Sequence, residues 1–292
     1  MKVLVTGGSG FIGKYVLNEL IKSNIDFVTI GRNERDYTHK YLRMDLLECT
    51  DFSSIIKDIK PTHLIHLAWH TKHGEYWDSA LNYDWMNVTQ RLLESFCQNG
   101  GKHVLITGTC AEYDWRYGYC LEDFTPTNSN SIYGNIKNET RIISQKICKE
   151  HNVNLTWARL FYPYGLGETS ERLIPSLFDV CNGKKEVFGV NIKAYRDLVH
   201  VSDVANAIVL CSKKNINNII NISSGEPTCL GSLVKLIAKI CKYDANNFLS
   251  IKSIKMGEPK FLIGDSERLH KVGWQKMIDI DYGISTYTRG IL

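Results

Sequence analysis

The sequence predicts an α/β fold in which a doubly wound parallel sheet is followed by a smaller C-terminal region. Two observations predict this fold class. Short apolar segments alternate with amphipathic helical patterns up to about residue 160, and a β-branched run near the N-terminus leads directly into a glycine-rich turn. Strand–helix alternation is typical of parallel sheets, whose ligands bind at the carboxyl ends of the strands. A chain of 292 residues, of which 43% are hydrophobic, can bury a sizeable core.

The first predicted strand, residues 2–6, ends in the glycine-rich turn, and a helical pattern over residues 11–23 follows it. The glycines satisfy both the spacing G-x-G-x-x-G (positions 8, 10 and 13) and the spacing G-x-x-G-x-x-G (positions 7, 10 and 13). A bare backbone at this junction lets a phosphate approach closely, and the free N–H groups and the helix dipole favour an anion. The sequence therefore predicts a Rossmann-type dinucleotide site formed by Gly7, Gly10, Phe11, Ile12 and Gly13.

The later elements alternate in the same way. Apolar segments predict strands at residues 27–30, 41–44, 63–67, 103–107 and 155–160, and amphipathic patterns predict helices at residues 51–57, 83–99 and 133–150. The alternation then breaks: residues 163–188 look irregular, residues 203–211 and 230–241 look helical, and residues 198–201 and 219–222 could return to the sheet as strands. The predicted domains are a dinucleotide-binding domain over residues 1–161, with a return of about 195–222, and a smaller substrate-binding region over residues 162–194 and 223–292.

Composition and charge exclude several other classes of protein. The formal net charge is only +4 and no dense Lys/Arg block occurs, so a nucleic-acid partner is not expected. No apolar run is long enough to span a bilayer, so a membrane protein is not expected either. Nine cysteines without a C-x-x-C pair fit reduced thiols, which favours a cytoplasmic protein. His70 and His73 alone are more typical of a surface than of a metal site, so no metal is expected.

Three side chains in the middle of the chain form a candidate catalytic group. Tyr133 and Lys137 are spaced i and i+4 at the start of a predicted helix, so they share one helical face. A lysine ammonium near the phenol lowers its pKa and makes the tyrosine a usable proton donor or acceptor. Thr109 follows the predicted strand 103–107, so its hydroxyl emerges at a strand end, where it could hold a substrate oxygen.

Together these motifs resemble the extended short-chain dehydrogenases/reductases of the NAD-dependent epimerase/dehydratase family, which act on nucleotide sugars. The resemblance spans nearly the whole chain and rests on residues 6–13, 45–46, 66–68, 109–113, 133–137, 159–165, 195–201 and 273–274. It implies a catalytic triad of Thr109, Tyr133 and Lys137, with the last two also touching the cofactor. It further implies cofactor contacts at Asp45, Leu46, Leu67 and Ala68 and a substrate-diphosphate contact at Arg196, for which a structural ion pair with Asp197 or Asp203 is the alternative.

Similar proteins form homodimers through the helices predicted here at residues 83–99 and 133–150. The apolar residues of these helices suggest the same pairing in this chain, although they could equally face the sheet: Leu92, Leu93, Phe96, Ile142, Ile143 and Ile147. A homodimer is therefore expected.

The residues around the triad favour one reaction of the family over the others. Cys110 and Ala111 stand where the 4,6-dehydratases carry an Asp-Glu pair, which disfavours dehydration, and Cys110 is one residue away from the acid–base cysteine of other epimerases. Tyr162 replaces the asparagine that follows Arg-x-Phe in 4-epimerases. The sequence therefore predicts reduction of the C4 ketone of a nucleotide-linked 4-keto-6-deoxy or 3,6-dideoxy hexose in deoxysugar biosynthesis, with Thr109, Cys110, Tyr162 and Arg196 as substrate contacts.

Two other functions stay open at this point, a nucleotide-sugar 4-epimerase with tightly held NAD and a non-catalytic NADPH-binding relative. The intact triad argues against the non-catalytic relative, because a protein that only binds NADPH does not need all three residues.

The residue at the end of the second predicted strand bears on the choice of cofactor. Arg32 lies about 20 residues past the glycines, where an acidic side chain would bind the ribose 2′-hydroxyl of NAD. An arginine suits a 2′-phosphate, so NADPH is expected. Glu34 or Asp36 could instead fold back towards the ribose, which leaves NADH or NAD possible.

Overall fold

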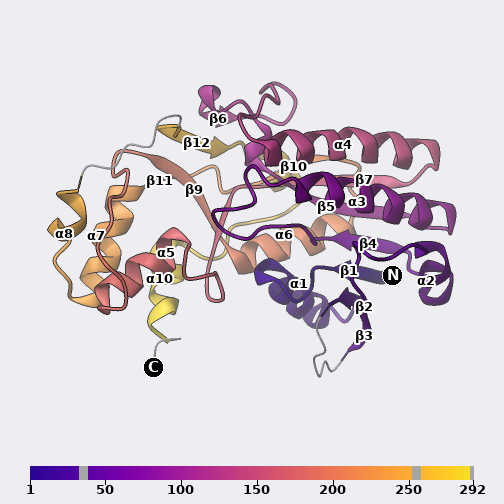
Figure 1. The fold of residues 1–292 in the computed structure, drawn as a ribbon, viewed down its shortest axis with the longest axis horizontal. Helices are drawn as coiled ribbons and strands as arrows, with labels where there is room; N and C mark the ends of the chain where they lie inside the picture. Colours follow the sequence, from indigo (N-terminus) through magenta and orange to yellow (C-terminus); the bar gives the residue numbers. More distant parts are fainter. Residues whose placement is uncertain (33–38, 252–257, 290–292) are drawn as a thin grey trace.

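A parallel sheet forms the centre of the protein in the computed structural model, which describes residues 1–32, 39–251 and 258–289 (Figure 1). Within these residues the sheet has seven strands, in the order β10-β7-β5-β4-β1-β2-β3, and every pairing is parallel. The strands are β1 (Lys2–Thr6), β2 (Asp26–Gly31), β3 (Lys40–Arg43), β4 (His63–His66), β5 (His103–Thr109), β7 (Asn154–Leu160) and β10 (Asn218–Ile222). The predicted fold class is confirmed, and each strand predicted before residue 161 is present.

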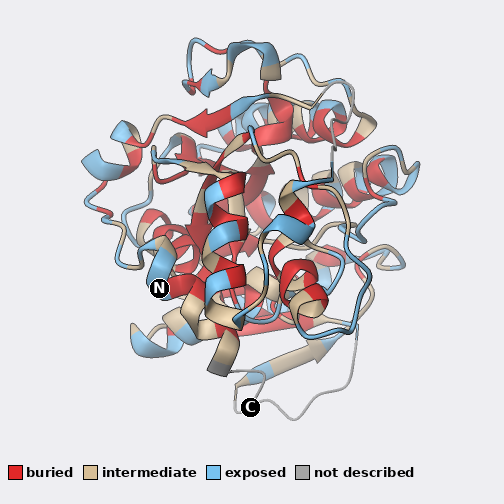
Figure 2. Cartoon of the chain, turned by 90° about the vertical axis from the view of Figure 1, so that its left-hand side faces the viewer, coloured by how far each residue is buried: buried red, intermediate tan, exposed pale blue. Residues whose placement is uncertain are grey.

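Helices cover both faces of this sheet, which explains why most residues of its strands are buried. One face carries α1 (Phe11–Lys22) and α6 (Val201–Lys213), and the other carries α2 (Phe52–Ile59), α3 (Leu81–Gln98) and α4 (Ile132–Glu150). Each helix turns an apolar stripe inwards, so the buried residues lie in the strands and on the inner sides of the helices (Figure 2). The chain crosses from one face to the other between β1 and β4, which is where an open α/β sheet binds its ligand.

The region after residue 160 is more regular than the sequence predicts. It supplies four strands of a second sheet, which has the order β11-β9-β12-β6 with β8 paired to β9, and β6 joins this sheet from before residue 160. The strands are β6 (Tyr119–Cys120), β8 (Tyr162–Tyr164), β9 (Tyr195–His200), β11 (Pro227–Cys229) and β12 (Phe261–Gly264). The helices are α5 (Leu173–Cys181), α7 (Leu230–Cys241), α8 (Asn246–Leu249), α9 (Glu267–Lys271) and α10 (Ile280–Arg289), and two single turns, η1 (Cys110–Glu112) and η2 (Trp115–Tyr117), follow β5.

The prediction that residues 163–188 are irregular was wrong, because β8 and α5 lie there. Helix α5 is short and contains Pro175, so its sequence gives little helical signal. Of the two strands that could return, residues 219–222 lie in β10 of the main sheet, whereas residues 198–200 lie in β9 of the second sheet. Helices α5, α7, α8 and α10 share a separate apolar core and gather at one end of the molecule (Figure 1).

The apolar residues that suggested a dimer interface mostly face the sheet of their own chain. Leu92, Leu93, Phe96 and Ile147 are buried in the core under α3 and α4, whereas Ile142 is 46% exposed. Packing against the sheet of the same chain therefore explains why these residues are apolar, and no dimer interface is needed to explain it. The homodimer remains a proposal without this support, and light scattering would test it.

Candidate active site

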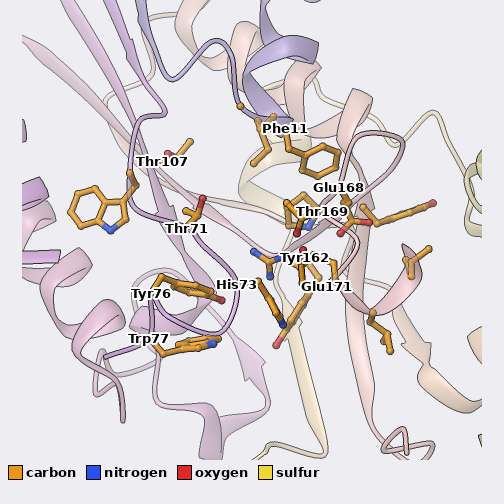
Figure 3. Close-up of a pocket in the computed structure, with 18 of the residues that line it drawn as sticks. Phe11, Thr71, His73, Tyr76, Trp77, Thr107, Tyr162, Glu168, Thr169 and Glu171 are labelled. Atoms are coloured by element: carbon orange, nitrogen blue, oxygen red, sulfur yellow. The ribbon is translucent and has the colours of Figure 1, made fainter. Parts of the chain in front are cut away.

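A cavity of about 950 Å³ opens at the carboxyl ends of β1 and β4, between the main sheet and the smaller region (Figure 3). Most of the predicted cofactor residues line it, together with Tyr162 and Arg196 on the other side: Gly7, Gly10, Phe11, Ile12, Gly13, Arg32, Leu46, Leu67 and Ala68. The two sides of the cavity thus come from segments that are far apart in the sequence. This arrangement suits a dinucleotide on one side and a second ligand on the other.

The glycine-rich turn leaves no room for side chains at two positions. A Cβ atom on Gly13 would lie 2.1 Å from the carbonyl oxygen of Gly7, and a Cβ atom on Gly7 would lie 2.6 Å from the amide nitrogen of Ala68. Gly7 also has a φ of 74°, in the left-handed region that favours glycine. Helix α1 begins at this turn without a side-chain cap on Gly10, so its first N–H groups remain available to an anion. The turn therefore fits the pyrophosphate of a dinucleotide.

We expect Gly13→Ala to weaken cofactor binding at least about 10-fold, since the turn must move to accept the methyl group. Alanine has a helix propensity about 1 kcal/mol better than glycine, but this gain cannot offset a backbone overlap at 2.1 Å. Fluorescence titration with NADPH measures the effect, and Lys14→Ala, at an exposed position of the same helix, is the control. Equal cofactor affinity in both variants would contradict the assignment of the turn.

The far end of the dinucleotide side carries one arginine and one carboxylate. The Arg32 guanidinium lies 3.8 Å from the Asp45 carboxylate, and the arginine side chain is 70% exposed. Asp45 also accepts a hydrogen bond from the backbone N–H of Leu47. Leu46, the next residue, is buried and lines the cavity. Asp45 is not among the lining residues, but its partner Arg32 is. Glu34 and Asp36, the alternative ribose ligands, lie outside the described residues.

The three predicted catalytic residues meet at the end of β5. Ser131 caps α4 by accepting a hydrogen bond from the N–H of Gly134, and a Cβ atom on Gly134 would lie 2.2 Å from the carbonyl oxygen of Ala111. This close approach places Tyr133 beside Thr109. Burial raises the pKa of the Tyr133 phenol well above its usual range, and a hydrogen bond with the Thr109 side chain partly offsets this rise.

Lys137 is buried one helical turn after the tyrosine, with only 2% of the residue exposed. Its Nζ donates a hydrogen bond to the carbonyl oxygen of Thr107 at 2.8 Å and lies 3.6 Å from the centre of the Trp69 ring. Burial lowers the pKa of Lys137 to about 7, whereas the charge of Glu112 favours the ammonium form. The face of an aromatic ring also favours a cation, so Trp69 and Glu112 both support the protonated lysine.

A buried carboxylate holds the end of β5 in place. Glu112 Oε1 accepts a hydrogen bond from the backbone N–H of Thr109 at 2.8 Å, and Glu112 Oε2 accepts one from Arg159 Nε at 2.7 Å. The indole N–H of Trp157 lies 3.0 Å from both carboxylate oxygens. The side chains of the ion pair are 0% and 1% exposed. Glu112, Thr107 and Trp69 were not predicted as site residues from the sequence, although the tryptophan just after the predicted strand 63–67 was a usable signal for the last of them.

On the substrate side, Arg196 has different partners from those considered in the sequence. The guanidinium donates hydrogen bonds to the Glu258 carboxylate at 2.8 Å and to the carbonyl oxygens of Tyr195 and Pro259. Asp197 instead binds the backbone of residues 224, 225 and 264, and Asp203 binds residues 277 and 278, so the ion pair considered for Arg196 was wrong in its partner.

The position of the predicted Cys110 contact argues against proton transfer by its thiol. The side chain is 7% exposed, and burial raises the pKa of its thiol far above the ordinary value. Within the described ranges, no group of three histidine, cysteine or acidic side chains could hold a metal ion. The same ranges contain no helix with the length and apolarity needed to cross a bilayer.

Known proteins resemble this chain over its whole length. A UDP-glucose 4-epimerase from Lactobacillus helveticus is 26% identical, over 98% of this chain and 96% of the relative. A GDP-6-deoxy-D-talose 4-dehydrogenase from Aggregatibacter actinomycetemcomitans is 27% identical, over 93% of this chain and 91% of the relative. Among solved structures, the Thermus thermophilus UDP-glucose 4-epimerase in complex with NAD has a TM-score of 0.84 over 100% of both chains, at 19% identity.

The structural likeness at this identity shows the fold alone. The family assignment comes from the sequence, because the profile of the NAD dependent epimerase/dehydratase family matches residues 3–223. This match contains the glycine-rich turn, the candidate triad and the β9 strand that carries Arg196. The chain therefore belongs to the NAD dependent epimerase/dehydratase family, whose members modify nucleotide sugars with NAD(P).

Proposed function

We propose that this protein carries out NAD(P)-dependent hydride transfer at C4 of a nucleotide-linked hexose. The observation that carries the proposal is the meeting of Thr109, Tyr133 and Lys137 at the end of β5, in contact with Thr107 and Tyr76, which line the same cavity as the glycine-rich turn. The two relatives described above are named as enzymes that act at C4, one as a 4-epimerase and one as a 4-dehydrogenase. A purely NADPH-binding protein would have no use for the buried Tyr–Lys pair.

Two reactions at C4 are compatible with this site. Reduction of a 4-keto-6-deoxy or 3,6-dideoxy hexose consumes one NADPH per turnover, whereas 4-epimerisation with tightly held NAD consumes no cofactor. The relatives favour epimerisation, since several of them are UDP-glucose 4-epimerases. The side chains favour reduction, because Tyr162 lines the cavity where the resemblance places an asparagine in 4-epimerases.

The described residues supply the parts that either reaction needs. When bound, NAD(P)H supplies the hydride for the C4 carbon. In the direction of reduction, the hydroxyl groups of Thr109 and Tyr133 bind the C4 oxygen, and Tyr133 gives its proton to that oxygen as negative charge develops on it. The Lys137 ammonium stabilises the resulting phenolate and holds the nicotinamide ribose. Cys110 takes no part in proton transfer, since its buried thiol stays protonated.

A panel of nucleotide sugars separates the two reactions. CDP-, dTDP-, GDP- and UDP-linked 4-keto-6-deoxy sugars are incubated with NADPH and the loss of absorbance at the nicotinamide band is followed. In parallel, UDP-glucose and UDP-galactose are incubated without added reductant and the sugars are analysed. Stoichiometric oxidation of NADPH identifies a reductase, and interconversion without it identifies an epimerase. Neither reaction with any substrate would contradict hydride transfer at C4.

The cofactor preference is predicted from Arg32. We propose that NADPH binds more tightly than NADH, because the exposed guanidinium can pair with a 2′-phosphate. Arg32→Asp should lower the affinity for NADPH about 10- to 100-fold, since a hydrogen bond to a charged group is worth roughly 1.5–3 kcal/mol. Lys22→Asp, at the exposed end of α1, changes the net charge equally and is the control. Equal affinities for NADPH and NADH in the unmodified protein would remove the basis of this prediction.

A further inference from the structure

Aromatic side chains surround the predicted catalytic tyrosine on the substrate side. The ring of Tyr76 lies 4.9 Å from the ring of Tyr133, and the ring of Trp77 lies 5.9 Å from it, measured between ring centres. Tyr76 and Trp77 stack on each other at 4.7 Å, and Trp115 meets Trp77 edge to face at 6.0 Å. Tyr76, Trp77 and Trp115, here called the aromatic wall, all line the cavity.

The aromatic wall is tied to the catalytic elements by its own polar groups. The backbone N–H of Tyr133 donates a hydrogen bond to the carbonyl oxygen of Trp77 at 2.9 Å. The indole N–H of Trp115 donates to the carbonyl oxygen of Cys110 at 3.0 Å, next to Thr109. The second bond occupies the indole N–H of Trp115, and the hydroxyl of Tyr76 is hydrogen-bonded with the Arg172 side chain, so two of the three polar side-chain groups of the wall have protein partners. Figure 3 shows Tyr76 and Trp77 side by side at one end of the cavity, across from Tyr162 and Glu171.

The position of the reacting carbon decides which part of the sugar meets this wall. The C4 oxygen must come within about 3 Å of the Tyr133 hydroxyl for proton transfer. In a hexopyranose, C3 and C5 are bonded to C4, and C6 is bonded to C5. The substituents at C3 and C6 therefore lie within a few ångströms of the tyrosine, where the aromatic wall begins.

We propose that the aromatic wall is a subsite for the deoxygenated edge of the sugar, so that the substrate is a nucleotide-linked 6-deoxyhexose, including 3,6-dideoxy forms. This inference rests on the proposed hydride transfer at C4. A methyl group at C6 packs against aromatic carbon without losing a hydrogen bond, whereas a hydroxymethyl group gives up its water partners there. A carboxylate at C6 gives up a larger hydration free energy at this wall. The Arg172 guanidinium, 5.8 Å from the Tyr76 ring centre, is a charged group that could partly offset this loss, so a C6 carboxylate sugar is included in the test.

Equilibrium binding tests this subsite without turnover. In the Tyr133→Phe protein, which keeps the ring, UDP-glucose, UDP-6-deoxyglucose and UDP-glucuronic acid are titrated by calorimetry in the presence of NADP⁺, and the thymidine series is titrated in the same way. The 6-deoxy sugar should bind roughly 10- to 100-fold more tightly than the 6-hydroxy sugar, the range that an apolar pocket achieves against an added hydroxyl. Equal affinity, or tighter binding of the hydroxymethyl or carboxylate sugar, overturns the proposal.

Two substitutions of Trp77, each made in the Tyr133→Phe protein, test whether the aromatic wall causes the preference for the 6-deoxy sugar. Trp77→Gln supplies amide donors and acceptors and should bring the affinity ratio close to one, whereas Trp77→Phe keeps an aromatic face and should retain it. A ratio that survives Trp77→Gln overturns the role of the wall. If Trp77→Gln does not fold, the ratio in the Tyr133→Phe protein still decides. Failure of the C4 reaction itself would show as a loss of turnover with every sugar, while the affinity ratio is measured independently of it.

Discussion

Tyr133→Phe is expected to lower kcat by about 100-fold or more, because a positioned general acid typically contributes 10²–10⁴-fold. The substitution removes the hydroxyl to which we assign protonation of the C4 oxygen, while the phenylalanine ring keeps the contacts with Tyr76 and Trp77. The group acts where charge develops, so kcat should fall much more than the affinity for substrate. Steady-state kinetics with the best nucleotide sugar of the panel, together with calorimetric binding of that sugar, measure both effects.

Two further substitutions bracket this result. Lys137→Met should lower kcat comparably and also weaken cofactor binding, since the ammonium is held at the end of β5 by the carbonyl oxygen of Thr107, which lines the cavity. Cys110→Ser should change kcat little, because the buried thiol has no proton-transfer role. Near-parental turnover by Tyr133→Phe would falsify the proposed scheme.

The sequence predicted the main sheet well because its signals are local. Each strand of the main sheet before residue 161 contains a short apolar run, and each helix between these strands carries one apolar stripe, so a few residues are enough to recognise either. The glycine-rich turn is also readable, since the spacing of Gly7, Gly10 and Gly13 reflects close backbone approaches within one turn. The second sheet was missed because its strands are short and pair across large separations, as β12 does with β6 and β9.

The same distinction applies to the candidate site. Thr109, Tyr133 and Lys137 follow from local spacing and a strand end. The partners of the site residues do not, because Trp69 approaches Lys137 from the segment after β4, and Glu258 meets Arg196 across a separation of 62 residues. Side-chain contacts of this kind depend on tertiary packing, and the sequence around an arginine does not indicate which carboxylate it will pair with.

The largest effect on stability is expected from Glu112→Gln. The substitution keeps the size of the side chain but leaves the Arg159 guanidinium buried without a counter-charge, since both side chains of this ion pair are at most 1% exposed. Removing one partner of a buried pair typically costs about 3–5 kcal/mol. The new amide also turns donor hydrogens towards Trp157 Nε1 or Arg159 Nε, which are themselves donors, so at least one hydrogen bond is lost.

Urea denaturation measures this loss, and the protein supplies a matched control. Glu267 makes an exposed pair with Lys271 one helical turn away, with both side chains more than two-thirds exposed. Glu267→Gln makes the identical chemical change and should cost less than about 0.5 kcal/mol, as exposed helix pairs do. If the two variants shift the urea midpoint equally, burial does not increase the contribution of the Glu112–Arg159 pair to the free energy of unfolding, and the prediction is wrong. A large shift confined to Glu112→Gln, with a lower kcat in the folded fraction, would instead show that the carboxylate supports both the fold and the position of Thr109, whose N–H it holds at 2.8 Å.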